Sequence, residues 1–138
     1  MSNKGFTHLH LHSQYSLLDG AISLDKLLKR CKELQMDSVA VTDHGNMFGT
    51  IEFYTKAQAA HIKPILGIEA YIAPRSRFDR QKCSITDAAY HLILLAENNT
   101  GYQNLLKLAS IGFTEGFYYR PRIDKEILAE LNAGLIAT

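Results

Sequence analysis

The sequence predicts an α/β fold of successive βα units, whose natural architecture is a parallel sheet or barrel. Apolar, strand-like runs start near residues 6, 38, 65, 90 and 135, and helical patterns lie between them. With 138 residues and 46% hydrophobic residues, the chain is one domain or part of one and can bury a core. Because four units cannot close an ordinary barrel, we expect an incomplete one.

In the first half of the chain, three strands alternate with two helices. The strands are expected at 6–12, 38–42 and 65–72, and the helices at 23–35 and 51–61. Asp19-Gly20 is a turn-forming pair before the first helix, which Ser23 is placed to cap. The apolar side chains of that helix recur at three- and four-residue steps, which is typical of an amphipathic helix.

The second half continues the alternation with a fourth strand at 90–96. Thr100 and Gln103 form a T-x-x-Q capping box, which predicts a third helix over about 101–111. Asp124 is placed to cap a fourth helix through Leu131. Gly134 follows the end of that helix, and 135–137 opens a fifth strand.

Composition and charge exclude several classes of protein. The formal charge of +1 argues against a strong overall field, so contact with nucleic acid must depend on a local patch. Cys31 and Cys83 are the only cysteines, which is typical of reduced thiols and not of a disulfide scaffold. The sequence has neither an apolar signal core nor the roughly 18 to 20 apolar residues of a membrane span. We therefore expect a cytoplasmic protein that has no membrane partner.

Histidines and carboxylates are concentrated near the ends of the predicted strands. His8, His10 and His12 alternate along the first strand and share one face, so neighbouring imidazoles can converge on one ion. Asp43-His44 follows the second strand. In barrels of βα units the chemistry gathers at the carboxyl ends of the strands. Imidazoles mixed with carboxylates suit zinc, manganese or iron, so a metal site is the leading hypothesis.

Each of these residues also has a plainer interpretation. A single strand histidine can fill the core or form a hydrogen bond there, and His8, near the start of its strand, fits a packing role. His61 follows a helix, where an exposed or capping position is expected, and Asp19 alone could be a turn residue. Glu69 and His91 lie within apolar strands and need polar partners, which a metal cluster would provide.

Six stretches of the sequence together resemble one family. The runs 8–20, 42–46, 62–71 and 91–96 closely resemble the PHP (polymerase and histidinol phosphatase) domain. The later runs 99–105 and 116–124 are similar to the members of this family that begin bacterial replicative DNA polymerases. A lone His-x-His would be a weak signal, but this ordered set is specific and covers essentially the whole chain.

The resemblance implies a distorted, TIM-like (β/α)7 barrel that holds up to three divalent metal ions (Zn, Mn or Fe) in a nine-ligand cleft. The other three ligands are expected beyond Thr138, so residues 1–138 are expected to be the N-terminal half of the domain. Asp43 is assigned to the catalytic site as a residue that orients its neighbours or a ligand imidazole. Six ligands carry over by motif: His10, His12, Asp19, His44, Glu69 and His91.

The implied activity is metal-assisted phosphodiester hydrolysis at a DNA 3′ end, a proofreading 3′–5′ exonuclease. Nucleotidyl transfer would reside in the remaining polymerase domains. Two alternatives stay open: a non-catalytic docking module for a separate proofreading exonuclease subunit, and a free-standing PHP phosphatase acting on a small phosphate ester. For residues 1–138 alone we expect weak metal binding, no robust nuclease activity, and self-association through the open edge of the fifth strand.

One local basic patch is a candidate for nucleic-acid binding. Phe78 and a single acidic residue, Asp79, lie within it. Such a patch can follow a phosphate backbone, although a solvated loop tip explains the same charges, as it does for Arg120 and Arg122. The patch consists of Arg75, Arg77, Arg80 and Lys82.

Overall fold

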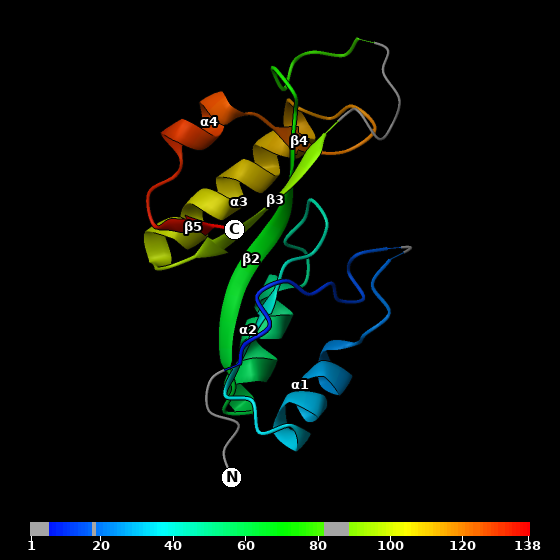
Figure 1. The fold of residues 1–138 in the computed structure, drawn as a ribbon, viewed down its shortest axis with the longest axis vertical. Helices are drawn as coiled ribbons and strands as arrows, with labels where there is room; N and C mark the ends of the chain where they lie inside the picture. The colour runs from blue at the N-terminus through cyan, green and yellow to red at the C-terminus, as the bar shows by residue number, and fades with distance from the viewer. Residues whose placement is uncertain (1–5, 18, 82–88) are drawn as a thin grey trace.

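Five strands form one mixed sheet in the computed structural model, which describes residues 6–17, 19–81 and 89–138. Figure 1 shows a long β2 joining a lower part, with α1 and α2, to an upper part, with α3 and α4. The elements in chain order are α1 (Leu24–Glu33), β1 (Ser38–Val41), α2 (Thr50–Ala59), β2 (Lys63–Ile72), β3 (Tyr90–Ala96), α3 (Asn99–Thr114), β4 (Arg122–Ile123), α4 (Lys125–Glu130) and β5 (Leu135–Ala137).

The strand directions correct the expectation of a parallel sheet. The order is β1-β2-β3-β5, with β4 also paired to β2. β1 and β4 run parallel to β2, but β2 and β3 are antiparallel, as are β3 and β5. A parallel connection needs a crossover, usually a helix, and residues 73–81, the described part of the β2–β3 connection after β2, contain none. The chain therefore turns back beside β2.

The first predicted strand is only an extended segment. Residues 6–12 have no regular strand and contact β1 and the residue after it through two backbone hydrogen bonds, from Ala40 N to His8 O (2.8 Å) and from Thr42 N to Leu11 O (2.9 Å). The Leu11 amide donates to the Thr42 hydroxyl at 3.1 Å instead of to a backbone carbonyl. A side chain thus replaces one bond of a regular ladder, which sequence alternation alone does not reveal.

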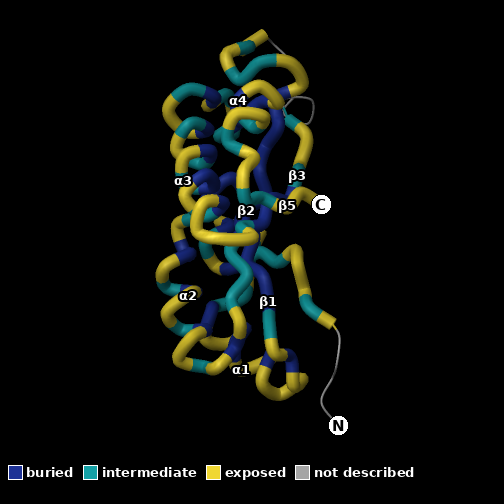
Figure 2. Tube along the Cα trace, turned by 90° about the vertical axis from the view of Figure 1, so that its left-hand side faces the viewer, coloured by how far each residue is buried: buried dark blue, intermediate teal, exposed yellow. Residues whose placement is uncertain are grey.

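The helices cover one face of the sheet (Figure 2). In β2, Ile68, Ala70 and Ile72 are buried in one core cluster with Leu105 and Leu108 of α3. A second cluster unites α1, α2 and β1. Because successive strand residues point to opposite faces, Gly67, Glu69 and Tyr71 of β2 lie on the face away from α3. This second face carries the candidate site.

Two helix starts differ in how well they were predicted. Asp124 is the N-cap of α4, as expected, and its side chain accepts from Ile127 N at 3.0 Å. For α3 the capping box is wrong, because Asn98 is the N-cap and its side chain accepts from Gly101 N at 3.1 Å. An Asn two residues upstream competes with Thr100 for the same role, and asparagine ranks higher at N-caps.

Three further expectations concern surfaces and thiols. In the described ranges, no helix is long and apolar enough to cross a membrane. Cys31 is a buried free thiol, and Cys83 lies outside the described residues. β5 has β3 as its one strand partner among the described elements, so self-association through its other edge stays a prediction.

Candidate metal centre

A single buried carboxylate, that of Glu69, lies at the centre of four imidazoles. Glu69 is 3% exposed and projects from the middle of β2 on the face away from α3. Its Oε2 lies 2.9 Å from His10 Nε2 and 3.3 Å from His44 Nδ1, and it also contacts His12 Nε2. Its Oε1 contacts His91 Nδ1. Side chains from four separate segments therefore meet at one acidic group.

A second carboxylate, Asp19, closes the cluster from the loop before α1. Its Oδ2 lies 2.5 Å from His44 Nε2 and 3.0 Å from His12 Nδ1. His12 and His44 thus direct one ring nitrogen to Glu69 and the other to Asp19, with ring centroids 3.9 Å apart. In metal sites, the second ring nitrogen of a bound imidazole commonly donates its N–H to a carboxylate in this way.

The donor atoms are spaced as ligands of a divalent ion are. Ligands of a first-row ion at metal–nitrogen distances near 2.0–2.1 Å lie roughly 3.0–3.4 Å apart. His10 Nε2 and His12 Nε2 are 3.1 Å apart, and His10 Nε2 is 2.9 Å from Glu69. All six predicted ligands belong to sets whose donor atoms lie within 4.8 Å of one another: His10, His12 and Glu69; His12, Asp19 and His44; His44, Glu69 and His91.

One ring nitrogen of the cluster is buried and suited to bind a metal ion. Among the described residues, His44 Nδ1 has no hydrogen-bond partner although it is buried and lies 3.3 Å from Glu69 Oε2. A buried, unsatisfied polar atom costs about 1–3 kcal/mol, and a neutral imidazole nitrogen is a good metal ligand. The residues therefore fit a divalent metal ion.

The carboxylates remain ionised beside the imidazoles. Burial works to raise the pKa of Glu69, but hydrogen bonds from His10 and His12 and the charges of His44 and His91 outweigh burial and hold this pKa below its usual range. The hydrogen bond from His44 is the main reason that the pKa of Asp19 is also lowered. Two anionic carboxylates are thus ready to bind cations at neutral pH.

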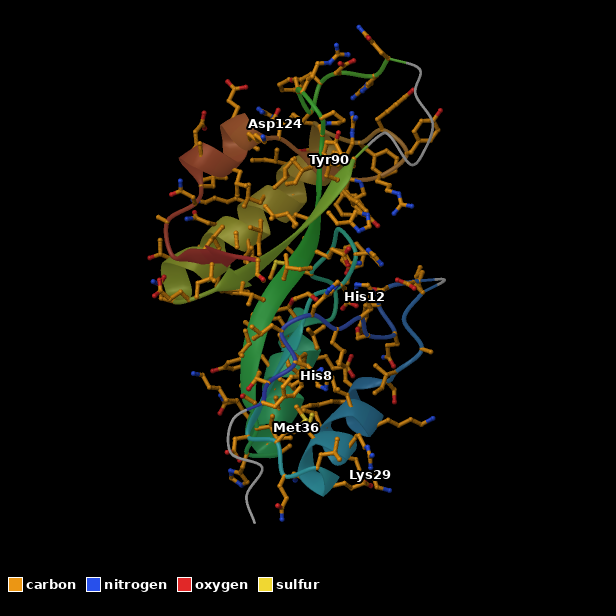
Figure 3. The ribbon with its side chains drawn as sticks, in the orientation of Figure 1. His8, His12, Lys29, Met36, Tyr90 and Asp124 are labelled. Carbon is orange, nitrogen blue, oxygen red and sulfur yellow. The ribbon has the colours of Figure 1, made fainter. Side chains whose placement is uncertain are left out.

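Backbone topology explains how distant residues meet. His44 follows β1 and forms an isolated parallel bridge with Glu69, and His91 lies opposite Tyr71 in the antiparallel β2–β3 pair. Because β3 runs antiparallel, its start lies beside the carboxyl end of β2, where His91 faces the cluster. In Figure 3 His12 lies near the middle of the molecule, whereas His8 lies further toward Met36.

Comparison with known proteins identifies the family. A family model described as PHP domain matches residues 8–138. The chain belongs to the PHP domain family. It is 55% identical to a DNA polymerase III subunit alpha of Borreliella burgdorferi over 96% of this chain and 12% of that protein. It is 57% identical to the same subunit of Thermus aquaticus over 96% of this chain and 11% of that protein.

Solved structures share the fold of this PHP chain at low sequence identity. An amidohydrolase from Chromobacterium violaceum aligns with a TM-score of 0.51 and 20% identity, over 78% of this chain and 34% of that one. A candidate metal-dependent phosphoesterase from Bifidobacterium adolescentis aligns with a TM-score of 0.50 and 16% identity, over the same shares of the two chains. The present chain therefore spans about a third of these neighbours and about an eighth of its polymerase relatives.

Asp43 precedes His44 of the imidazole–carboxylate cluster and contacts the loop that carries Asp19. It is 3% exposed and accepts from Ser13 N (2.7 Å), Ser13 Oγ (2.8 Å) and Ser16 Oγ (2.6 Å). Ser16 Oγ in turn accepts from His44 N at 3.1 Å. Asp43 belongs to none of the three ligand sets found among the described residues, and its role in orienting its neighbours stays a prediction.

Three arginines of the predicted basic patch have partners within the PHP fold, and nucleic-acid binding by the patch stays a prediction. Arg75 pairs with Asp79 at 2.6 Å, and Arg77 pairs with Glu115 at 2.7 Å and with Asp124 at 3.2 Å. Arg80 donates to Glu115 O at 3.4 Å, and Lys82 lies outside the described residues. Asp79 belongs to the patch itself, whereas Glu115 and Asp124 come from segments distant in sequence, so the run of charges alone did not reveal these two partners.

Other predictions concern residues outside the PHP cluster. The ring of His8 packs edge-on against Phe6 at 4.8 Å, in line with a packing role. His61 is exposed after α2 with φ 55°, a left-handed position typical of a helix end.

Sequence reasoning did not single out Tyr71, and it explained Arg120 as a charge of a solvated loop. The Tyr71 ring lies parallel to that of His44 at 5.9 Å, and Arg120 Nη1 donates to its hydroxyl at 2.5 Å. Strand alternation places Tyr71 on the Glu69 face and could have identified it. No local pattern marks Arg120, which arrives from the loop after α3.

Proposed function

We propose that this chain supplies most of the metal site of a phosphoesterase within a DNA polymerase III alpha subunit, and that the site cleaves phosphodiester bonds at a DNA 3′ end. The observation that carries the proposal is the convergence of four imidazoles and Asp19 around Glu69. Identities of 55% and 57% to polymerase subunits favour this parent over a small-molecule phosphatase.

Each residue of the cluster has a role in this proposal. The six donors hold divalent ions, Zn, Mn or Fe, of which a complete nine-ligand domain would take up to three, and we place the remaining ligands in residues that follow Thr138. Such ions, when bound, activate water and neutralise charge on the phosphoryl oxygens and the leaving 3′ alcohol. His12 and His44 can each donate an N–H to one carboxylate and keep the other nitrogen free as a ligand. Asp43 positions Asp19 and His44 through the loop 13–16.

The test uses the full-length protein that carries this segment. Metal content after dialysis and nucleotide release from a 3′-labelled DNA strand are compared between wild type, His12→Ala and His8→Ala. His8 is the matched control because it is an exposed histidine of the same segment and lies outside the ligand sets. We expect His12→Ala to lose metal and nuclease activity while polymerisation continues, and His8→Ala to retain all three.

Other results would assign another function. A protein that binds no metal at neutral pH and releases no nucleotide contradicts the proposal and favours a docking module for a separate exonuclease subunit. Hydrolysis of a small phosphate ester without attack on DNA favours a phosphatase. In either case the polymerase activity of the same sample shows that the protein is folded.

A further inference from the structure

We propose that Arg120, held in place by Tyr71, binds the phosphate group of the substrate at the edge of the metal centre. The proposal rests on the proposed function, because it names a substrate-binding residue of the same site.

Tyr71 extends the metal-ligand face of β2. It lies two residues after Glu69, so both side chains are on the same face of the strand, and it is 5% exposed. Its ring lies parallel to that of His44 at 5.9 Å and edge-on to that of His91 at 5.0 Å. Tyr71 therefore forms a wall of the metal centre, shared with two of its imidazoles.

Arg120 is fixed against this wall. Its guanidinium carbon lies 4.7 Å from the centroid of the Tyr71 ring, and Nη1 donates to the Tyr71 hydroxyl at 2.5 Å. These contacts hold the plane of the guanidinium, whereas a surface arginine has many rotamers. The rotamer entropy that substrate binding would otherwise cost is thus already lost.

The backbone on both sides of Arg120 also has close contacts within the fold. Tyr119 has φ 59°, a left-handed conformation that non-glycine residues rarely adopt, and Tyr118 N donates to Arg120 O at 3.1 Å. On the other side, Pro121 packs so closely on Gly45 that a Cβ there would lie 2.7 Å from Pro121 Cγ. Because Gly45 directly follows His44, the Arg120 loop is packed against a metal-ligand segment.

The partners of Arg120 differ from those of its neighbours. Arg77 is paired with two carboxylates, and buried Arg122 donates to the carbonyls of Gly116 and Asp79. Arg120 is half-buried and has no ion pair with any carboxylate of 6–17, 19–81 or 89–138. A guanidinium has five N–H donors in a planar fork, which matches two oxygens of a phosphate.

The negative charges of the cluster explain why an arginine is useful beside it. Asp19 and Glu69 are both ionised, so an anionic phosphate is attracted to this face only where cations offset these two negative charges. Arg120 lies against Tyr71, whose ring contacts His44 and His91, so its fixed positive charge adds to that of the bound ions and orients the phosphate relative to them. The chemical class of ligand is therefore a phosphate mono- or diester, with the guanidinium on its non-bridging oxygens.

The test measures phosphate binding directly. Inorganic phosphate is titrated calorimetrically into the full-length protein, manganese-loaded and metal-free, for wild type, Arg120→Gln, Arg120→Lys, Tyr71→Phe and Arg30→Gln. Arg30 is the matched control, since it is an exposed arginine on α1 paired with Glu33. Metal content and thermal unfolding of each variant are recorded in parallel.

We expect Arg120→Gln to weaken phosphate binding about tenfold or more with unchanged metal content. Arg120→Lys should recover part of the affinity, because an ammonium keeps the charge but not the planar fork. Tyr71→Phe should weaken binding less than Arg120→Gln does, and Arg30→Gln should bind as wild type does. If Arg120→Gln binds phosphate as tightly as wild type, or if wild type binds none in either metal state, the proposal is wrong.

The same experiment separates this inference from the proposed function. A wild-type protein that binds no manganese contradicts the metal site, yet an Arg120-dependent phosphate affinity in that metal-free protein would still support the anion site. Conversely, if the metal-loaded protein has the same phosphate affinity with and without Arg120, the metal site is still supported and only the role of Arg120 is wrong.

Discussion

His44 and Glu69 occupy partner positions in an isolated parallel bridge, with Gly45 N donating to Glu69 O at 2.9 Å and Glu69 N donating to Asp43 O at 3.1 Å. The bridge lies on the edge of β2 that pairs with β1 earlier and with β4 later. Backbone hydrogen bonds therefore set the spacing of two metal-ligand candidates. Because this spacing does not depend on flexible side chains alone, the cluster is preorganised for a cation.

Glu69→Gln is expected to abolish tight metal binding in the full-length protein. Glu69 contacts four imidazoles, and the neutral amide removes the charge while it keeps the shape. Substitutions of residues that only support ligands reduce metal affinity about 10–100-fold, so a change at the central carboxylate should cost about 100-fold or more. Titration with manganese, followed calorimetrically, measures the loss.

Glu97→Gln is the control for this change, because it replaces an exposed carboxylate outside the three ligand sets by the same amide. It should bind metal as wild type does. Equal metal affinities for Glu69→Gln and wild type would exclude Glu69 as a ligand.

Asp43→Asn is expected to destabilise the protein by about 1–3 kcal/mol. Asp43 accepts three hydrogen bonds from Ser13 and Ser16, and an amide nitrogen placed at one oxygen would face a donor. The loop that carries Asp19 should loosen, so metal affinity should fall together with the free energy of unfolding. Urea denaturation measures the stability, and Asp37→Asn, a change at an exposed aspartate, should have little effect.

A loss of metal affinity without any loss of stability would instead make Asp43 a direct participant at the site. An unchanged Asp43→Asn protein in both measurements would contradict the positioning role.

The sequence predicted site residues best where their position in a strand, or at its end, follows from their neighbours in the chain. Strand alternation and strand ends predicted His10, His12 and His44, and the structure brings them together with Asp19, Glu69 and His91. The direction of β3 was not predictable from its own residues, because a buried strand has the same apolar pattern in either direction. Direction depends on the connection, and the absence of a helical pattern after Ile72 was the signal that could have revealed it.

Contacts between distant segments account for other features that the sequence did not reveal. Arg77 meets Asp124 and Glu115 only after the chain has folded, so the sequence did not reveal these ion pairs, and nucleic-acid binding by the patch stays a prediction. Arg120 reaches Tyr71 in the same way, from a loop without a local pattern. Likewise, the Leu11 amide donates to the hydroxyl of Thr42, a residue distant in sequence, and residues 6–12 do not form a regular strand.

Asn98→Ala is expected to destabilise the protein by about 1 kcal/mol, and Thr100→Ala by much less. The Asn98 side chain accepts from Gly101 N at 3.1 Å, whereas Thr100 lies within the first turn of α3. Urea denaturation of both variants decides between the two caps. A larger loss for Thr100→Ala than for Asn98→Ala would restore the capping box that the sequence suggested.

Asp124 should make the stability of the protein sensitive to acid. Burial works to raise the pKa of its carboxyl, but hydrogen bonds from the amides of Arg77 and Ile127, together with the Arg77 guanidinium, hold the pKa below its usual range. A carboxyl with a lowered pKa in the folded state stabilises the protein fully at neutral pH, and this stabilisation is lost as the pH falls from about 5 through its folded-state pKa. Asp124→Asn should cost about 3 kcal/mol at pH 7, since it leaves Arg77 without a buried partner, and its unfolding free energy should fall less steeply with acid than that of wild type. Urea denaturation at a series of pH values measures both slopes, and parallel slopes for the two proteins would show that Asp124 has no lowered pKa.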